Sequence, residues 1–349
     1  MQTPVPLRSI CLLRTSALGD VTHVVPLLHT LHKGFPDARI TWIIGKLEQR
    51  LLAGLEGVEF VVFDKSRGMD GFREVRRALH GQRFDVLLHM QVALRSNLLS
   101  LAVHSGRRIG YDHARSKDLH GCFIRERIAT GQRQHVLDAM GSFVQPLGLK
   151  PLPVHWDLPV AEADHAWAAT QLYAGQHWLL INAVSSHALR NWRAERYAAV
   201  ADYAITALGW KVALTGGSGT HERTLGHAIL GAMHETPLDL IGRDTLKRAL
   251  ALYKRADALL TPDSGPMHMA NAMGTPVLGL HAATNPHRSG PYSDRRWCVN
   301  AYPAAARKYR HCEANELRWG SKLEYPGVMD LVTVDAVIER LEALALSRG

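Results

Sequence analysis

A polar segment typical of an anion-binding turn lies between two apolar runs, 258–260 and 277–280, that are typical of buried parallel strands. The segment contains Asp263, Ser264, Gly265 and His268. Pro266 suits the first turn of a helix, because its φ angle is already helical and its missing N–H would have no partner there. The turn therefore leads into a helix N-terminus, where N–H groups and the helix dipole favour a phosphate. An ordinary capped turn would have the same composition.

A second polar loop, from Thr15 to Asp20, follows the apolar stretch 9–14 near the start of the chain. Gly19 allows a tight turn there, because glycine has no Cβ to clash. Asp20 would stand in the first turn of the next helix. A carboxylate at that place can cap the helix, or it can accept a proton as a general base at the edge of a cleft. The residues by themselves leave both roles open.

A third loop follows the expected strand 178–183 and contains Ser185, Ser186 and Arg190. Two hydroxyl groups and a guanidinium group could hold a phosphate, and the arginine could do so with two parallel hydrogen bonds. A polar surface loop would look the same. Trp192, two residues further on, is more typical of packing than of ligand contact.

A fourth loop is the glycine-rich turn 216–219, which follows the expected strand 211–215 and includes Gly217. Glu222 stands where a dinucleotide-binding fingerprint would have its third glycine, which weakens that interpretation. The carboxylate could simply be an exposed residue in the first turn of a helix, where the helix dipole favours it.

These loops need a framework, and apolar runs alternate with amphipathic stretches along the whole chain. In the first half the expected strands are 9–14, 40–44, 58–63, 84–88 and 108–110. In the second half they are 178–183, 211–215, 238–241, 258–260 and 277–280. A proline-containing stretch, 149–159, separates the halves. The alternation predicts two doubly wound α/β domains, 1–150 and 160–331, with a cleft between them that could house a site.

The composition excludes several classes of protein. The chain has 349 residues, 46% hydrophobic and 21% charged, which fits a globular protein of two domains. No apolar run approaches the roughly 18 residues of a membrane span, and we expect no signal peptide. Four cysteines without paired spacing indicate reduced thiols and a cytoplasmic location. The net charge of +9 favours acidic partners, but no nucleic-acid-binding module is present.

Three of the loops resemble signatures of one family. The loop 15–20 and its continuation are similar to T-S-x-x-G-D-[VIL]-x-H-x-x-P, with matches at Thr15, Ser16, Gly19, Asp20, Val21, His23 and Pro26. Residues 263–268 are similar to D-[ST]-G-x-x-H, and residues 185–192 to [ST]-[ST]-x-x-x-[KR]-x-W. The chain thus resembles the ADP-heptose:lipopolysaccharide heptosyltransferases, glycosyltransferase family 9. The segment 311–327 has no counterpart in that resemblance.

The resemblance implies a GT-B fold, in which two Rossmann-like domains face a central cleft. The first domain would bind the acceptor, and the second would bind the nucleotide sugar. The C-terminal stretch 333–346 predicts a helix with Thr333 as its N-cap, and the resemblance implies that this helix packs back on the first domain.

The resemblance also implies an inverting transfer of heptose from ADP-heptose, with Asp20 as the general base. The implied donor-binding residues are Ser185, Ser186, Arg190, Gly217, Glu222, Asp263, Ser264, Gly265 and His268, with Glu222 on the ribose. The sequence has no Asp-x-Asp metal motif. A helix N-terminus and a basic side chain would then replace a divalent cation, and no cofactor is expected.

On the acceptor side the resemblance implies an anionic glycolipid, a Kdo-bearing lipid A of the lipopolysaccharide inner core. The residues implied for its binding are Thr15, Ser16, Lys46, Arg115 and His135. The protein would be cytoplasmic and could contact the inner membrane peripherally. Two other interpretations stay open: a family relative with another nucleotide sugar or acceptor, and a non-catalytic nucleotide- or nucleic-acid-binding protein.

Overall fold

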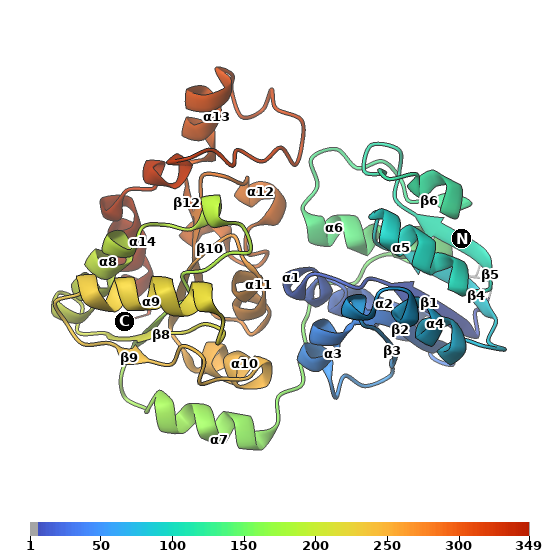
Figure 1. The fold of residues 1–349 in the computed structure, drawn as a ribbon, viewed down its shortest axis with the longest axis horizontal. Coiled ribbons are helices and arrows are strands. Elements are labelled where there is room, and N and C mark those ends of the chain that lie inside the picture. The colour runs from blue at the N-terminus through green and yellow to red at the C-terminus, as the bar shows by residue number, and fades with distance from the viewer. Residues whose placement is uncertain (1–5, 349) are drawn as a thin grey trace. The chain divides into compact units, whose positions relative to one another are not determined.

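The computed structural model describes residues 6–348. The chain divides into two units, Met1–Pro159 and Val160–Gly349. Each unit is built on a parallel sheet of six strands with helices packed around it (Figure 1). The predicted α/β class and the two doubly wound sheets are therefore confirmed.

The sheet of the first unit has the strand order β3-β2-β1-β4-β5-β6. Its strands are β1 (Ser9–Leu13), β2 (Arg39–Gly45), β3 (Glu59–Phe63), β4 (Phe84–His89), β5 (Ser105–Gly110) and β6 (Glu126–Arg127). The order reverses between β1 and β4, which pair directly. The loops that follow these two strands therefore meet at the carboxyl edge of the sheet, where an open α/β sheet places its ligands.

The helices of the first unit are α1 (Leu18–Thr22), α2 (Val25–Gly34), α3 (Lys46–Leu52), α4 (Met69–Ala78), α5 (Leu94–Leu99) and α6 (Val136–Gly141). One buried cluster joins Val75 of α4 and Leu79, which caps it, with Leu99 of α5 and with Cys11 and Leu13 of β1. Helices α4 and α5 consequently cover the same face of the sheet.

The segment that begins at Asp20 does not form one helix: the structure has two, α1 and α2, with a break before Pro26. Proline has no N–H to donate to the carbonyl four residues earlier, which here is Thr22 O. The indole N–H of Trp156 donates to Thr22 O instead, at 2.9 Å. The break is thus satisfied by a side chain from the stretch that leaves the first unit.

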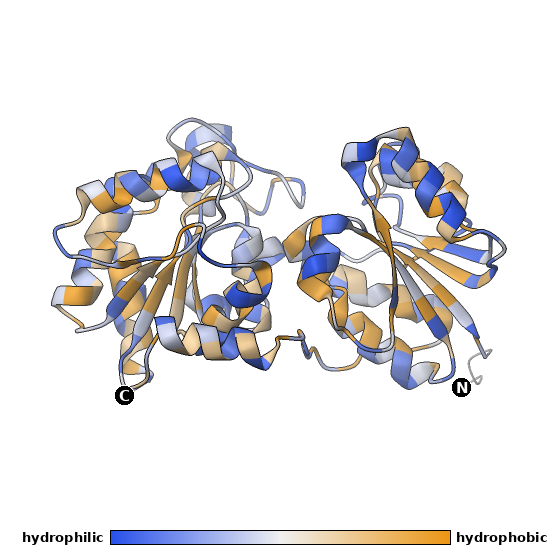
Figure 2. Ribbon diagram, turned by 60° about the horizontal axis from the view of Figure 1, so that its bottom comes forward, coloured by the Kyte–Doolittle hydropathy of each residue, from blue (hydrophilic) through white to orange (hydrophobic). Residues whose placement is uncertain are grey.

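The sheet of the second unit has the order β12-β11-β10-β7-β8-β9, with its reversal between β10 and β7. Its strands are β7 (Trp178–Ile181), β8 (Lys211–Leu214), β9 (Leu238–Asp239), β10 (Ala258–Pro262), β11 (Val277–His281) and β12 (Val299–Asn300). Figure 2 shows the hydrophobic strands at the centre of each unit, with helices that turn hydrophilic residues outward.

The helices of the second unit are α7 (Glu162–Gln171), α8 (Ala194–Thr206), α9 (Thr220–Ala232), α10 (Leu246–Arg255), α11 (Gly265–Ala272), α12 (Pro286–Ser289), α13 (Tyr302–Arg310) and α14 (Val334–Leu346). Helices α7 and α13 had no clear signal in the sequence. No described helix combines the length and the apolarity that a bilayer-spanning segment needs.

The C-terminal helix α14 is part of the second unit. Thr333 caps it as predicted, since its hydroxyl accepts from Ala336 N at 3.3 Å. The buried side chains Val337, Leu341 and Leu344 lie in the core of the second unit, and α14 packs on α8. The apolar face of α14 therefore completes the core of the second unit.

We predict that Leu341→Ala lowers the free energy of unfolding of the second unit by about 2–5 kcal/mol, because it opens a cavity in a packed core. Tryptophan fluorescence in urea reports mainly on this unit. It holds six of the eight tryptophans: Trp167, Trp178, Trp192, Trp210, Trp297 and Trp319. Leu346→Ala is the matched control, since Leu346 is 83% exposed on the same helix. Equal unfolding midpoints for the two variants would contradict the packing of α14.

Candidate functional site

The loops that follow β10, β7 and β8 form one edge of the second unit. These strands are parallel neighbours, so their carboxyl ends lie side by side. The edge carries the predicted donor residues, which come from three loops up to 83 residues apart: Ser185, Ser186, Arg190, Gly217, Glu222, Asp263, Ser264, Gly265 and His268. The structure therefore brings them to the same side of one sheet.

The turn after β10 has the form expected of an anion site. Helix α11 begins at Gly265, with Pro266 in its first turn and Ser264 as its N-cap. The Ser264 hydroxyl lies 2.9 Å from the Thr261 hydroxyl and does not cap the helix. Asp263 and His268 are nearly buried. The helix thus presents its N-terminal backbone at the carboxyl end of the central strand β10.

Arg190 is held beside this turn by two carboxylates. Its Nε and Nη2 atoms donate to Glu324 Oε1 at 2.9 and 2.7 Å, and its Nη1 lies 3.6 Å from Asp263 Oδ2. The guanidinium is therefore fixed in direction within a largely buried setting, where an ion pair is less screened than at the surface.

Glu324 is a site residue that the sequence did not reveal. It lies in the segment 311–327, for which no counterpart was recognised, and 134 residues separate it from Arg190. Leu323 N donates to Ala283 O at 2.8 Å, which anchors the segment beside the end of β11. Nothing in the spacing of these residues could have indicated the contact, because it depends on how a long connection returns to the sheet.

His281 lies beneath the same edge, at the end of β11, and is fully buried. Burial lowers its pKa to about 4, although the charge of Asp263 opposes the shift. Its Nδ1 lies 3.2 Å from the Thr284 hydroxyl. The ring is consequently neutral at neutral pH and adds no positive charge to the turn that follows β10.

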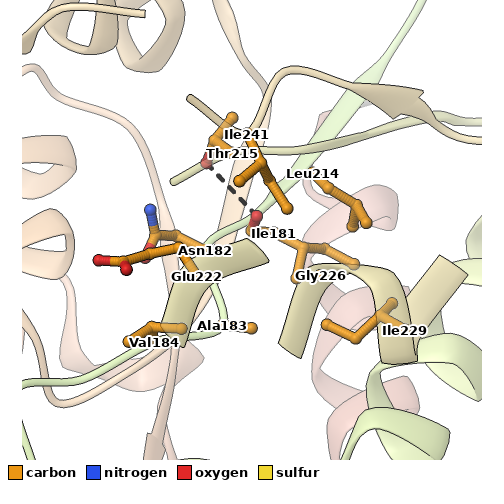
Figure 3. Close-up of a pocket in the computed structure, with 10 residues that line it drawn as sticks. All are labelled: Ile181, Asn182, Ala183, Val184, Leu214, Thr215, Glu222, Gly226, Ile229 and Ile241. Carbon is orange, nitrogen blue, oxygen red and sulfur yellow. Dashed lines mark hydrogen bonds between the residues drawn. The ribbon is translucent and has the colours of Figure 1, made fainter. Parts of the chain in front are cut away.

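A pocket opens between β7, β8 and α9, next to these loops (Figure 3). Its aliphatic lining includes Ile181, Leu214, Ile229 and Ile241, and its polar lining is Asn182, Thr215 and Glu222. Figure 3 shows Asn182 and Glu222 at one side and the aliphatic side chains of Leu214 and Ile229 at the other. The pocket therefore has an apolar floor and a carboxylate at one side.

Two glycines shape this pocket. A Cβ at Gly226 of α9 would lie 2.1 Å from Ile241 Cδ1, so glycine lets Ile241 close the floor. A Cβ at Gly219 would lie 2.4 Å from Glu222 Oε2. The Glu222 carboxylate therefore curls over the glycine-rich turn.

In the first unit, Asp20 lies in α1 and pairs with Arg14 at the end of β1. Arg14 Nη2 lies 2.5 Å from Asp20 Oδ2, and Ala17 N donates to the same oxygen at 3.2 Å. Burial alone would lower the pKa of Arg14, but the Asp20 charge raises it above its usual value. Asp20 thus supports the start of the helix and is also a carboxylate held by a partly buried cation.

Gln91, which follows β4, holds the loop that precedes Asp20. Thr15 N and Thr15 Oγ1 donate to Gln91 Oε1 at 2.7 and 2.9 Å, and Gln91 Nε2 donates to Ser16 Oγ at 2.9 Å. The hydroxyls of Thr15 and Ser16 therefore take part in fixing the loop. Gln91 was not singled out from the sequence, although the strand that it follows was predicted.

The other residues expected to bind an acceptor have internal partners. Lys46 Nζ donates to Asp64 at 3.1 Å. Arg115 pairs with Asp112 at 2.6 Å and donates to Gln134 Oε1 at 3.1 Å. These contacts tie both cations to neighbouring loops of the first unit.

His135 has a different environment, next to the helix that carries Asp20. It is the N-cap of α6, and its Nδ1 accepts from Leu137 N at 3.1 Å. The ring is buried and packs edge-on against His23, with 5.7 Å between the ring centroids. Because His23 directly follows α1, the structure brings His135 to the end of that helix.

The comparisons with known proteins point to one family. The sequence profile described as "Glycosyltransferase family 9 (heptosyltransferase)" matches residues 72–318, which is more than half of the chain. The chain belongs to glycosyltransferase family 9. It is 33% identical over 339 residues to the lipopolysaccharide core heptosyltransferase OpsX of Haemophilus influenzae, and the match covers 97% of each chain.

Two solved structures are similar over nearly the whole chain. A family 9 glycosyltransferase of Veillonella parvula has a TM-score of 0.80 at 23% identity, covering 99% of this chain and 100% of that one. The Escherichia coli heptosyltransferase WaaC with ADP has a TM-score of 0.73 at 16% identity, covering 96% and 99%. These likenesses show that the glycosyltransferase has the GT-B fold of the heptosyltransferases.

We predict a strong energetic coupling between Arg190 and Glu324. Their side chains are only 13% and 20% exposed, so the pair is poorly screened. A double-mutant cycle with Arg190→Ala and Glu324→Ala, measured by urea unfolding, should give a coupling of roughly 1–3 kcal/mol. Arg307 and Glu313 form the matched control, because both are 57% exposed at 3.2 Å, and their coupling should stay below about 1 kcal/mol. Equal coupling energies for the two pairs would contradict a poorly screened ion pair between Arg190 and Glu324.

Proposed function

We propose that this glycosyltransferase transfers a heptose from ADP-heptose to an acceptor of the lipopolysaccharide inner core, with inversion at the anomeric carbon. The observation that carries the proposal is the order of groups along one edge of the second unit. The pocket and Glu222 lie at β8 and β7, Arg190 follows β7, and the N-terminus of α11 follows β10. The 33% identity to a lipopolysaccharide core heptosyltransferase supports heptose as the sugar.

A nucleoside diphosphate matches that order. The adenine ring would enter the aliphatic pocket, and Glu222 at its rim would accept hydrogen bonds from the ribose hydroxyls. The diphosphate would then reach Arg190 and the N-terminus of α11, with Ser185, Ser186, Gly217 and the turn Asp263–Gly265 around it. The neighbouring strand ends are about 4.8 Å apart, so a chain of base, ribose and two phosphates can run across three of them.

The residues also suit a single-displacement mechanism. As the acceptor hydroxyl oxygen attacks the anomeric carbon, Asp20 would take the hydroxyl proton, and the bond from the sugar to the diphosphate would break on the opposite face. Arg14 would keep Asp20 ionised before the reaction, because a cation 2.5 Å away favours the carboxylate. Negative charge grows on the departing diphosphate, and Arg190 and the N-terminus of α11 would stabilise it.

We further propose that this stabilisation requires no divalent cation. The cation beside this turn is the Arg190 guanidinium, which Glu324 and Asp263 fix in direction, and a helix N-terminus adds partial positive charge. Together these groups supply the positive charge that a metal ion would otherwise bring to the leaving group.

For the acceptor we propose an anionic glycolipid of the Kdo-bearing lipid A type, handled by a cytoplasmic protein in peripheral contact with the inner membrane. His135, Lys46 and Arg115 of the first unit would bind its charged groups, and Gln91 would hold Thr15 and Ser16 in place near the attacking hydroxyl. The net charge of +9 supports an acidic acceptor.

The transfer can be tested directly. We expect purified protein to move heptose from ADP-heptose to Kdo-bearing lipid A, with release of ADP in equal amount, and we expect the rate to persist in EDTA. Mass spectrometry of the acceptor and a coupled assay for ADP measure both products. ADP-glucose is the matched donor control. Faster transfer from ADP-glucose would overturn the choice of sugar, and loss of activity in EDTA would overturn the metal-free mechanism.

Variants of Asp20 and of its partner Arg14 can distinguish a general base from a carboxylate with a structural role. We predict that Asp20→Asn lowers turnover by at least about a hundredfold, the low end of what a general base supplies. Arg14→Gln breaks the same ion pair but keeps the carboxylate, so turnover should fall less than about tenfold. ADP affinity should be unchanged in both, because its proposed contacts lie in the second unit. Equal losses of turnover would show that the ion pair, and not the base, is what the reaction needs.

A further inference from the structure

One face of the first unit exposes four leucines, Leu94, Leu98, Leu101 and Leu119, which we call the leucine surface. Their side chains are between 45% and 70% exposed. They are four of the nine large hydrophobic residues that are exposed in the described chain. Exposed apolar side chains scattered singly need no explanation, but a contiguous group marks an interaction surface.

The first three leucines belong to α5, which Figure 1 labels, and to the 3-10 turn that continues it, Ser100–Ala102. Their spacing of four and three residues places them on the same helix face. The opposite side is used for folding, since Leu99 and Val103 pack into the core of the unit with α4. The leucine surface is thus the outer side of a helix whose inner side is already covered.

The loop 117–119 adds the fourth leucine to the same place. Leu94 N donates to Asp118 Oδ2 at 3.3 Å, and Asn97 Nδ2 donates to Asp118 O at 2.7 Å, so the loop is tied to α5. Asp118 and Leu119 have φ angles of 51° and 60°, in the left-handed region that non-glycine residues rarely adopt. The backbone therefore adopts an unfavourable conformation that leaves a leucine 70% exposed.

Basic side chains surround the leucine surface. Arg95 lies on α5, Lys117 lies in the loop 117–119, and Arg125 directly precedes β6. Arg76 and Arg77 lie on α4, which packs against the 3-10 turn after α5. All five are exposed, and none of them pairs with an acidic side chain within residues 6–348. The one exposed carboxylate in the loop, Asp118, is engaged by α5.

We propose that the leucine surface docks on an anionic phospholipid bilayer, with its leucines in the acyl–headgroup boundary and its basic rim against the phosphates. The proposal rests on the proposed function, because a membrane-anchored glycolipid acceptor requires the enzyme at the bilayer. Aliphatic residues with a one-sign basic rim complement anionic lipid. A protein partner would more commonly meet aromatic residues and mixed charge.

Vesicle flotation without donor or acceptor tests the docking. We expect the protein to bind vesicles of phosphatidylcholine with one quarter phosphatidylglycerol, and to bind pure phosphatidylcholine much less. The triple variant Leu98→Ser, Leu101→Ser, Leu119→Ser should bind at least about tenfold more weakly, because each leucine contributes burial in the bilayer. The control is Tyr173→Ser with Leu346→Ser, two exposed apolar residues of the second unit, and it should bind like the wild type.

The basic rim has its own control. Arg95→Gln, Lys117→Gln, Arg125→Gln should weaken binding by about fivefold for each charge removed. Lys211→Gln, Lys254→Gln, Arg340→Gln changes the net charge equally at exposed positions of the second unit and should have little effect. Equal losses in the two triple variants would mean that net charge alone binds the vesicle, which would overturn the proposed surface.

A native cysteine reports on the contact itself. Cys122 is exposed next to the loop 117–119, whereas Cys11 and Cys298 are buried. With Cys312→Ser, an environment-sensitive dye on Cys122 should brighten on vesicles and be quenched by lipids spin-labelled near the headgroup. With Cys122→Ser, the same dye on Cys312 should not respond. The reverse pattern would place the bilayer contact elsewhere.

Two further results would overturn the proposal. The first is wild-type protein that does not float with the vesicles. The second is a dimer, seen by light scattering, that the leucine variant abolishes, because the surface would then be an interface between two copies of the chain. The leucine variant should keep its melting temperature and its turnover of a deacylated, water-soluble acceptor. If the wild type fails to turn over that acceptor while vesicle binding is intact, then the proposed function has failed and the docking has not.

Discussion

Both units depend on one constraint: parallel strands end at the same edge of a sheet. In the second unit, β10, β7 and β8 are neighbours, so loops from distant parts of the chain are brought together at their carboxyl ends. In the first unit, β1 and β4 are neighbours, and this places Gln91 against Thr15 and Ser16. The order of the strands therefore decides which candidate residues lie close together, because each of them is in a loop at the carboxyl end of a strand.

At these edges, cations are held by carboxylates. Arg190 lies between Glu324 and Asp263, and Arg14 lies between Asp20 and the carbonyl of Met90. Such pairs contribute modestly to stability, because each charge must first lose its water. Their value is direction, because partners at two sides fix how each guanidinium group lies. The two pairs thus fix the orientation of groups that the proposed chemistry needs, one at the leaving phosphate and one at the base.

Much of this arrangement was predictable from local sequence. The apolar runs located ten of the twelve strands, because buried parallel strands are continuous stretches of hydrophobic residues. The turn at Asp263 to Pro266 and the N-cap at Thr333 were also predictable, since proline and capping residues act over three or four positions. The short strands β6 and β12 have two residues each and carry no periodic signal.

The sequence by itself determined the α/β alternation, the two sheets and the loops that carry the polar groups, because each depends on residues within one element. Only the tertiary structure decided that Trp156 satisfies the break at Pro26, that Glu324 holds Arg190, and that α14 completes the core of the second unit. Each of the first two contacts joins residues that are 134 positions apart in the chain. The third contact needs the whole apolar face of a helix. Local propensity cannot specify them, because the partner of a buried polar group or apolar face is chosen by how distant segments pack.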